Sequence, residues 1–185
     1  MEEKAQAEYG QYLGLYIGAE EYAIGILQVK EILQFETITH VPGMPPSVRG
    51  VINVRGSVVP VVDLAVKFGR PETAVTNRTC VVILETRLDG EATVMGVMAD
   101  AVSQVVELSA ADILPPPSFG TRVHADYITG MGRSGRKFIL VLDIDKLLAD
   151  DELKVAGRQP GGAEGAGPAC AARDALATEE DVTTA

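Results

Sequence analysis

The pattern of apolar and polar positions across residues 9–156 predicts a mainly β protein. Short runs rich in Val and Ile alternate with Gly, Pro and charged residues, as is typical of barrels and sandwiches. The predicted strands are residues 12–17, 22–24, 51–54, 58–62, 79–84, 93–98, 102–108, 127–131 and 137–142. The first two form a hairpin across a turn at residues 18–21. Three short helices are predicted, over residues 29–33, 64–68 and 144–148, and none has the length of a crossover helix in a parallel sheet.

An internal repeat organises these elements. Residues 28–32 recur as residues 104–108, and residues 50–64 recur in the same order as residues 130–144. Each half reads as strand, glycine turn, strand, and then an Asp that opens a short helix. We infer two similar β-units, each too small to be stable alone, that share a buried seam. Such a seam is a natural place for a partner to bind.

Composition narrows the class of protein. The 185 residues include 16 basic and 26 acidic side chains. This acidity argues against nucleic acid as the main partner, because phosphate binding needs concentrated Lys and Arg. No apolar run approaches the roughly 18 residues of a membrane span, and residues 1–5 lack the features of a secretory signal. We therefore expect a soluble, cytoplasmic protein.

The end of the chain has a different composition. Residues 157–185 are rich in Gly, Ala and acidic side chains and almost lack large apolar ones, so we expect a disordered tail after a folded domain at residues 9–156. Cys80 lies in an apolar run and Cys170 in this tail, and the pair suggests neither a disulfide framework nor a thiolate metal site.

Candidate catalytic and cofactor motifs each have a simpler structural interpretation. Residues 130–135 spell G-x-G-x-x-G, but a strand rather than a helix follows, so the sequence predicts a hairpin turn instead of a dinucleotide site. His40 and His124 stand apart from other metal ligands. Asp63 and Asp143 each precede a short apolar helix and are expected to cap it. We find no catalytic constellation and expect no cofactor.

Two features remain open between a structural and a binding role. Residues 42–46 form a stiff proline turn that is either a connector or, with exposed Met44 and Val48, an apolar contact surface. Glu31, in a predicted helix, and Arg55, at a glycine turn, are either solvated surface charges or part of a binding site.

Several long motifs together resemble the CheW family of chemotaxis coupling proteins. They are residues 50–64, residues 22–24 with 29–32, and residues 101–105, 113–117 and 139–148. The resemblance extends from about Tyr9 to Leu153. It implies two SH3-like five-stranded β-barrels with a few short helices, in agreement with the repeat.

The resemblance also implies a function without catalysis or cofactors. Members join the cytoplasmic tip of methyl-accepting chemoreceptors to the regulatory domain of a CheA-type histidine kinase. They act in receptor arrays at the membrane and do not insert into the membrane themselves. Mapped onto this chain, the receptor-binding groove between the barrels contains Val29, Glu31, Arg55, Val102, Ser103 and Val105. The kinase-binding patch on the first barrel contains Pro42, Pro45, Val48 and Asn53.

Three other functions are alternatives. Coupling proteins of pilus or other sensory arrays carry the same signature. A regulatory module of a signalling enzyme is a second alternative, although the chain contains no kinase or phosphoacceptor motif. A small hydrolase using Asp63 or Asp143 would need a paired nucleophile and base, which the sequence does not offer.

Overall fold

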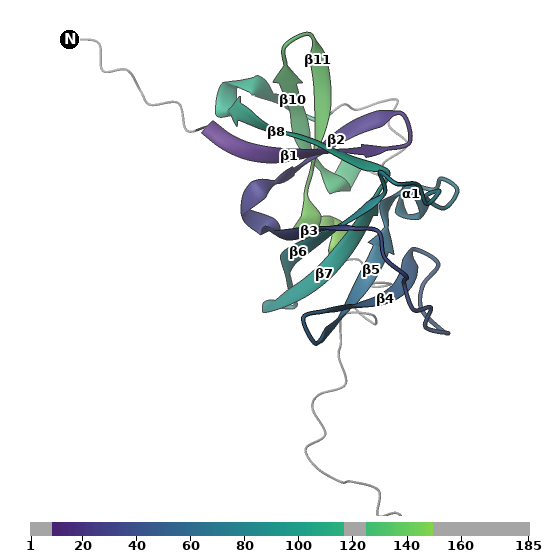
Figure 1. The fold of residues 1–185 in the computed structure, drawn as a ribbon. Helices are drawn as coiled ribbons and strands as arrows, with labels where there is room; N and C mark the ends of the chain where they lie inside the picture. The colour runs from purple at the N-terminus through teal and green to yellow at the C-terminus, as the bar shows by residue number, and fades with distance from the viewer. Residues whose placement is uncertain (1–8, 117–124, 150–185) are drawn as a thin grey trace, which may run out of the picture.

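The computed structural model describes residues 9–116 and 125–149, and these residues form two β-sheets (Figure 1). In the five-stranded sheet the spatial order is β3 (Val29–Gln34), β6 (Cys80–Leu88), β7 (Glu91–Ala99), β5 (Ser57–Asp63) and β4 (Val48–Val54). In the six-stranded sheet it is β8 (Ala101–Ser109), β1 (Tyr9–Ile17), β2 (Glu20–Gly25), β11 (Lys137–Leu142), β10 (Ile128–Ser134) and β9 (Ile113–Leu114). The helices are α1 (Leu64–Lys67) and α2 (Ile144–Leu148), with 3-10 turns η1 (Ile26–Gln28), η2 (Ala110–Asp112) and η3 (Ala125–Tyr127).

The predicted mainly β class is confirmed. Each predicted strand overlaps an observed one, and both later helices lie where they were expected. The first hairpin is also confirmed, but its turn is shorter than predicted, because Glu20 and Glu21 already pair with Ile17 and Tyr16. Residues 130–134 belong to β10 and Gly135 to its turn into β11, so the glycine motif lies in a β-hairpin, as predicted.

The helix predicted over residues 29–33 is wrong. These residues form β3, an edge strand that pairs antiparallel with β6. Its burial alternates along the strand, with Val29, Glu31 and Leu33 on the more buried side. The acidic Glu31 occupies an inward position and Ile32 an outward one, so the sequence does not show the apolar alternation of a half-buried strand.

The two sheets have the same arrangement of strands in space, but the corresponding strands occur in a different order along the chain. In the first sheet the hairpin β6–β7 lies between β3 and β5, and β7 pairs parallel with β5. In the second sheet the N-terminal hairpin β1–β2 lies between β8 and β11, and β2 pairs parallel with β11. The repeat therefore covers β3, β4, β5 and α1 against β8, β10, β11 and α2, while each unit receives its hairpin from a different part of the chain.

Each sheet curls until its far strands meet. In the first, Arg55 after β4 contacts Glu31 of β3, although β3 and β4 are the two edges of the sheet. In the second, a Cβ on Gly132 of β10 would lie 2.4 Å from Leu108 Cδ1 of β8, so these two strands also lie against one another. Glycine at position 132 allows this close approach.

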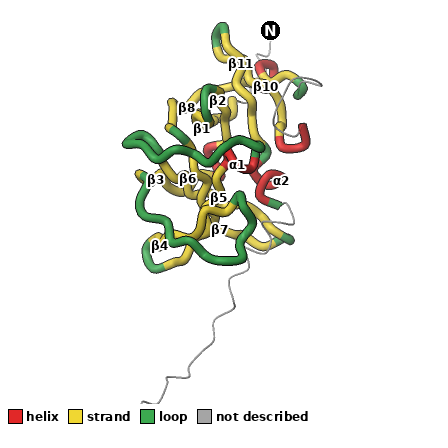
Figure 2. The backbone as a smooth tube through the Cα atoms, turned by 90° about the vertical axis from the view of Figure 1, so that its right-hand side faces the viewer, coloured by secondary structure: helices red, strands yellow, loops and turns green. Residues whose placement is uncertain are grey.

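One central hydrophobic cluster contains residues from both sheets. From the six-stranded sheet it includes Leu15, Ile17 and Tyr22, and from the five-stranded sheet Val82 and Met95. Each sheet has a further cluster of its own. Figure 2 shows α1 and α2 between the upper and lower parts of the molecule, and both helices contribute residues to this central cluster.

Polar contacts add to this packing. Asp145 of α2 accepts a hydrogen bond from Thr86 Oγ1 at 2.6 Å and another from Arg87 N at 3.2 Å, both in β6. The helix that follows the last strand of one sheet is thereby bound to the other sheet.

The helix caps are confirmed. Asp63 Oδ1 accepts from Ala65 N at 2.9 Å, and Asp143 Oδ1 accepts from Lys146 N at 3.1 Å. Asp63 is fully buried and also accepts from both the backbone N–H and the hydroxyl of Thr73. Burial of this carboxylate is compensated by three donors. His124, Cys170 and the tail at residues 157–185 lie outside the described residues.

Candidate partner-binding surfaces

The ion pair between Glu31 and Arg55 is the clearest feature of the predicted receptor site. Arg55 lies in the β4–β5 turn with φ +52°, followed by Gly56 with φ +88°. Its Nη2 donates to Glu31 Oε1 at 3.0 Å. The Arg55 side chain is 82% exposed and that of Glu31 32%, so water screens the pair and its contribution to stability is at most about 1 kcal/mol.

Asn53 holds the turn that carries Arg55. Its Oδ1 accepts a hydrogen bond from the backbone N–H of Gly56, the second of the two turn residues, at 2.8 Å. Such a side-chain bond to the backbone stabilises a tight turn. Asn53, predicted to contact the kinase, thus lies near Arg55 and away from the proline turn.

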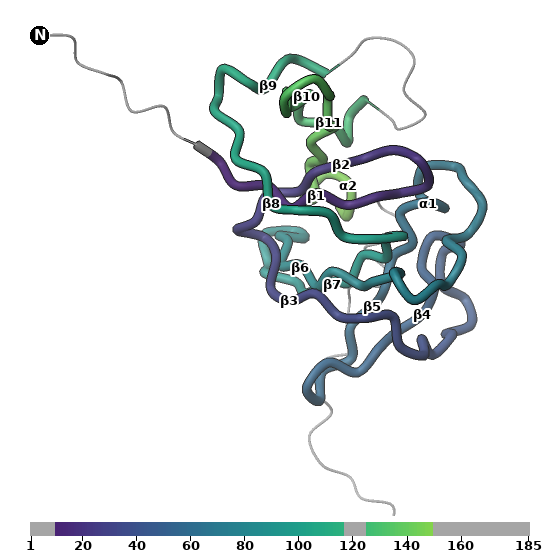
Figure 3. The backbone as a smooth tube through the Cα atoms, turned by 45° about the horizontal axis from the view of Figure 1, so that its top comes forward, coloured from purple at the N-terminus to yellow at the C-terminus, as the bar shows by residue number. Residues whose placement is uncertain are grey.

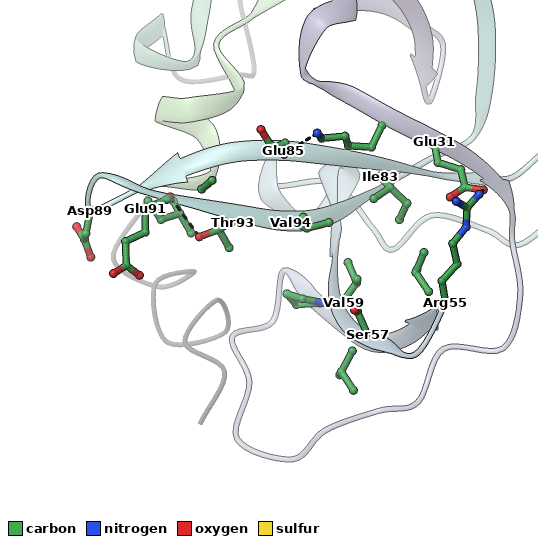
Figure 4. A pocket seen from close by; sticks show the side chains of 16 residues that line it. Glu31, Arg55, Ser57, Val59, Ile83, Glu85, Asp89, Glu91, Thr93 and Val94 are labelled. Atoms are coloured by element: carbon green, nitrogen blue, oxygen red, sulfur yellow. Dashed lines mark hydrogen bonds and ion pairs between the residues drawn. The ribbon is translucent and has the colours of Figure 1, made fainter. Parts of the chain in front are cut away.

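A groove of about 930 Å³ extends along the five-stranded sheet from this ion pair (Figure 4). Its charged lining residues are mostly acidic, and its two cations are paired, Arg55 with Glu31 and Lys30 with Glu85 at 2.6 Å. Val58 and Val94 provide exposed apolar surface. The lining residues are Lys30, Glu31, Val54, Arg55, Ser57, Val58, Val59, Pro60, Ile83, Glu85, Leu88, Asp89, Glu91, Ala92, Thr93 and Val94.

The other predicted receptor residues lie outside this groove. Val29 precedes Glu31 on β3, whereas Val102, Ser103 and Val105 lie on β8 of the other sheet. Val29 and Val102 both pack against the central cluster, and Val105 is 48% exposed. In the view of Figure 3, β8 lies between β1 and the five-stranded sheet. The predicted set therefore spans both sheets.

A second groove, of about 580 Å³, lies beside the proline turn. Pro45 and Val48 of the predicted kinase patch line it, together with Met44, whereas Pro42 is exposed nearby. The expectation that Val48 is exposed is wrong: it is 4% exposed, because it pairs with Val62 and joins the central cluster. The groove is lined by Phe35, Thr37, Ile38, His40, Met44, Pro45, Pro46, Val48, Arg49 and Glu72.

Comparison with known proteins identifies the family. The model of the CheW-like domain matches residues 11–152. The chain belongs to the CheW-like family. It is 36% identical over 143 residues to "Chemotaxis protein CheW" of Klebsiella aerogenes, covering 77% of this chain and 84% of that protein. It is 31% identical over 147 residues to the protein of the same name from Treponema pallidum, covering 80% and 86%.

A solved CheW structure has the same fold. The scaffolding protein TtCheW from Thermoanaerobacter tengcongensis matches with a TM-score of 0.68 and 26% identity, covering 77% of this chain and 94% of that chain. The expected architecture of two SH3-like β-barrels is thereby confirmed, with the short β9 as an additional strand in the second unit.

Titratable groups in this CheW-like chain have structural roles. Burial raises the pKa of the Cys80 thiol, which keeps it protonated and unreactive. Burial also raises the pKa of Tyr22, and its hydroxyl donates to Glu20 at 2.6 Å. Within residues 9–116 and 125–149, no three His, Cys, Asp or Glu side chains are grouped so that they could hold a metal ion. None of the helices described is long and apolar enough to cross a membrane.

Sequence analysis missed the charged residues that follow α1. Glu72 forms an ion pair with Arg49 at the second groove, and Arg70 reaches the β1–β2 turn. The only signal in the sequence is that Arg70 and Glu72 flank Pro71 directly after a helix-ending glycine. The composition of such a loop does not show which of its charged side chains form ion pairs in the folded protein.

Proposed function

We propose that this protein is a non-catalytic adaptor that couples chemoreceptors to a CheA-type histidine kinase in chemotaxis signalling. The observation that carries the proposal is the Glu31–Arg55 pair, an exposed charged contact at the first groove, in a chain whose relatives are named chemotaxis proteins. The protein acts by binding, in the cytoplasm, at receptor arrays on the membrane.

The receptor surface includes the predicted residues of both sheets. Val29 and Val102 supply apolar area next to the central cluster, and Val105 supplies exposed apolar area on β8. Glu31 and Arg55 supply charges of opposite sign at the edge of that surface. A receptor tip with an apolar stripe and flanking charges is complementary to it, the charges giving specificity and orientation.

The kinase surface is the second groove. Met44 and Pro45 form its accessible apolar side next to the buried Val48, and the paired Arg49 and Glu72 form its polar side. The prolines fix the backbone of this loop before binding, which reduces the ordering entropy that association costs. Grooves of this modest size favour weak contacts, and repetition in an array makes their sum strong.

The test is isothermal titration with two kinds of partner. The purified protein is titrated with the regulatory domain of each CheA-type kinase of the source organism, and separately with a soluble fragment of a receptor tip. We expect saturable binding of one kinase domain, weakened by Met44→Glu, and of the receptor tip, weakened by Glu31→Arg. Phe138→Glu, at an exposed position of β11 outside both grooves, is the matched control for both partners.

Absence of binding to every kinase domain and every receptor tip, with a folded protein, would overturn the proposal. Binding only to a kinase of a pilus or other sensory system would assign the adaptor to that pathway and would contradict a role in chemotaxis.

A further inference from the structure

The segment of residues 69–73 follows α1 and contacts both sheets. The backbone of Arg70 is fixed to α1, because its N–H donates a hydrogen bond to Ala65 O at 2.8 Å. Its side chain leaves the first unit and reaches the β1–β2 hairpin of the second. There Nη1 donates to Ile17 O at 3.1 Å, and Nη2 lies 2.5 Å from Glu20 Oε2.

The turn that receives Arg70 is shaped to accept it. Gly18 has φ +63°, and a Cβ at this position would lie 2.4 Å from Arg70 Nη1. A side chain there would displace the guanidinium, so glycine is required for the contact as well as for the turn. From the other side Gly18 N donates to Asp100 Oδ2 at 2.7 Å, and Asp100 is the residue between β7 and β8.

Glu20 connects the same contact to the core. Its Oε2 accepts the hydroxyl of Tyr22, a fully buried residue whose ring centroid lies 5.4 Å from that of Phe68. Phe68 immediately precedes the segment. Arg70 is thus one side of a closed set of contacts that includes both sheets, and its own side chain is only 15% exposed. The Glu20 side chain is 52% exposed, so water partly screens the ion pair, whereas the charge-assisted bond from Arg70 to Ile17 O is part-buried.

The other end of the segment contacts β5 and a wall of the second groove. Thr73 donates its N–H and its hydroxyl to the buried Asp63, each at 2.8 Å. Glu72 forms its ion pair with Arg49 of β4. Five consecutive residues therefore connect a wall of the second groove to the β1–β2 hairpin.

From this geometry we propose that Arg70 is a positioning residue that fixes the orientation of the six-stranded sheet relative to the five-stranded sheet. Through Glu72 and Arg49, the same segment links this orientation to the second groove. A partner that contacts β3 and β8 together binds only those protein molecules in which the two strands have the required relative orientation. Its apparent affinity therefore falls when a smaller fraction of the molecules has that orientation. The effect on receptor and kinase binding rests on the proposed function. The role of Arg70 in the orientation of the two sheets does not depend on that function.

The orientation is measured without any partner. Nitroxide labels are attached to Ala92→Cys on β7 and Lys137→Cys on β11, both exposed positions, in a background with Cys80→Ala and Cys170→Ala. We expect Arg70→Ala to broaden or shift the distance distribution between the labels. Arg70→Lys keeps the charge but loses the bidentate fork, and we expect an intermediate distribution.

The matched control is Arg78→Ala, an exposed arginine in the same α1–β6 connection. Its distribution is expected to equal that of the parent protein. If Arg70→Ala does not fold, Glu20→Gln weakens the same contact while Arg70 keeps its bond to Ile17, and the same broadening is expected. Distributions that do not change in any folded variant would overturn the proposal and leave Arg70 a local support of the hairpin turn.

A second measurement tests the link to function. We expect Arg70→Ala to weaken binding of the receptor-tip fragment about fivefold or more, and Arg78→Ala to leave it unchanged. Altered distances with unchanged receptor affinity would refute the link to receptor binding alone. If the parent protein binds no receptor, the proposed function fails, and the distance measurement still decides the role of Arg70.

Discussion

Arg55 Nη2 lies 3.0 Å from Glu31 Oε1, and this contact joins β3 to the β4–β5 turn at opposite edges of one sheet. In the hydrogen-bonded order of the sheet, three strands (β6, β7 and β5) lie between β3 and β4. The ion pair therefore marks the line along which the first unit closes. A contact so exposed adds little to stability, and its position beside an apolar surface suits recognition of a partner.

Reversal of both charges is expected to restore binding that either single reversal weakens. Glu31→Arg places two like charges together, and Arg55→Glu in the same protein recreates an attractive pair. The measurement is a double-mutant cycle on receptor-tip affinity. Each single variant is expected to change the free energy of unfolding by less than about 1 kcal/mol.

The matched control is the nearby pair Lys30–Glu85, whose side chains are about half exposed. Its reversal as Lys30→Glu with Glu85→Lys is expected to leave receptor affinity unchanged. A coupling energy of zero for Glu31 and Arg55 would contradict their functional pairing.

The two equivalent helix caps are expected to differ in their importance for stability. Asp63→Asn places an amide donor against the donors of Thr73 inside the core, so we expect a loss of about 2–4 kcal/mol. Asp143→Asn changes a cap that is 24% exposed at its side chain, and asparagine caps well, so a loss below about 1 kcal/mol is expected. Urea denaturation measures both. Equal losses would show that the Thr73 contacts contribute nothing.

Gly50→Ala is expected to be among the most destabilising single substitutions. Gly50 has φ +144°, and a Cβ there would lie 2.2 Å from the backbone oxygen of Thr39. Gly43→Ala is the control, because its φ is +82° but a Cβ would meet open space. We expect a loss of about 1–2 kcal/mol for Gly43 and a clearly larger one for Gly50, measured by thermal unfolding. A smaller loss at Gly50 than at Gly43 would mean that the β4 backbone moves aside easily.

Asp112 gives a prediction about pH. Hydrogen bonds from the hydroxyl and the backbone N–H of Ser109 lower the pKa of this carboxyl below its usual range. A lowered pKa in the folded state stabilises the fold above the pKa of the unfolded chain, and this contribution is lost as the pH falls through the folded value. Ser109→Ala is expected to raise the pKa of Asp112. Carbon NMR of the Asp112 carboxyl over a pH titration measures this change. Ser57→Ala, in the other sheet, is the control, and an unchanged titration in Ser109→Ala would disprove the stated cause.

Deletion of residues 157–185 is expected to leave the melting temperature nearly unchanged. The composition of this stretch offers few large apolar side chains that could be buried. Calorimetry of the full and shortened chains is the measurement. A large drop in melting temperature would show that these residues pack on the rest of the protein.

Local patterns predicted most of the strands because apolar runs, glycine turns and capping Asp residues act within a few positions. The hairpin turn at residues 130–135 and the caps at Asp63 and Asp143 are examples. β3 was mistaken for a helix because Glu31 occupies an inward position of the strand. Its partner, Arg55, lies 24 residues away, so no local pattern could explain the placement of that charge.

The contacts between the sheets were the least predictable part. Arg70 reaches Ile17 and Glu20 across a sequence separation of 53 and 50 residues. The repeat indicated that two similar units exist, but it did not show that the hairpin of the second unit comes from the beginning of the chain. Non-local pairings of this kind follow from the packing of the whole molecule.

The permuted order of the strands has a consequence for synthesis on the ribosome. All five strands of the first sheet lie between Val29 and Ala99, so this sheet can assemble as soon as that stretch has emerged. The β1–β2 hairpin emerges earlier but needs β8 and β11, and β11 ends only at Leu142. The first hairpin to be synthesised is therefore among the last to pair with its neighbouring strands. Until β11 has been synthesised, the apolar face of this hairpin stays exposed and open to contacts with other nascent chains.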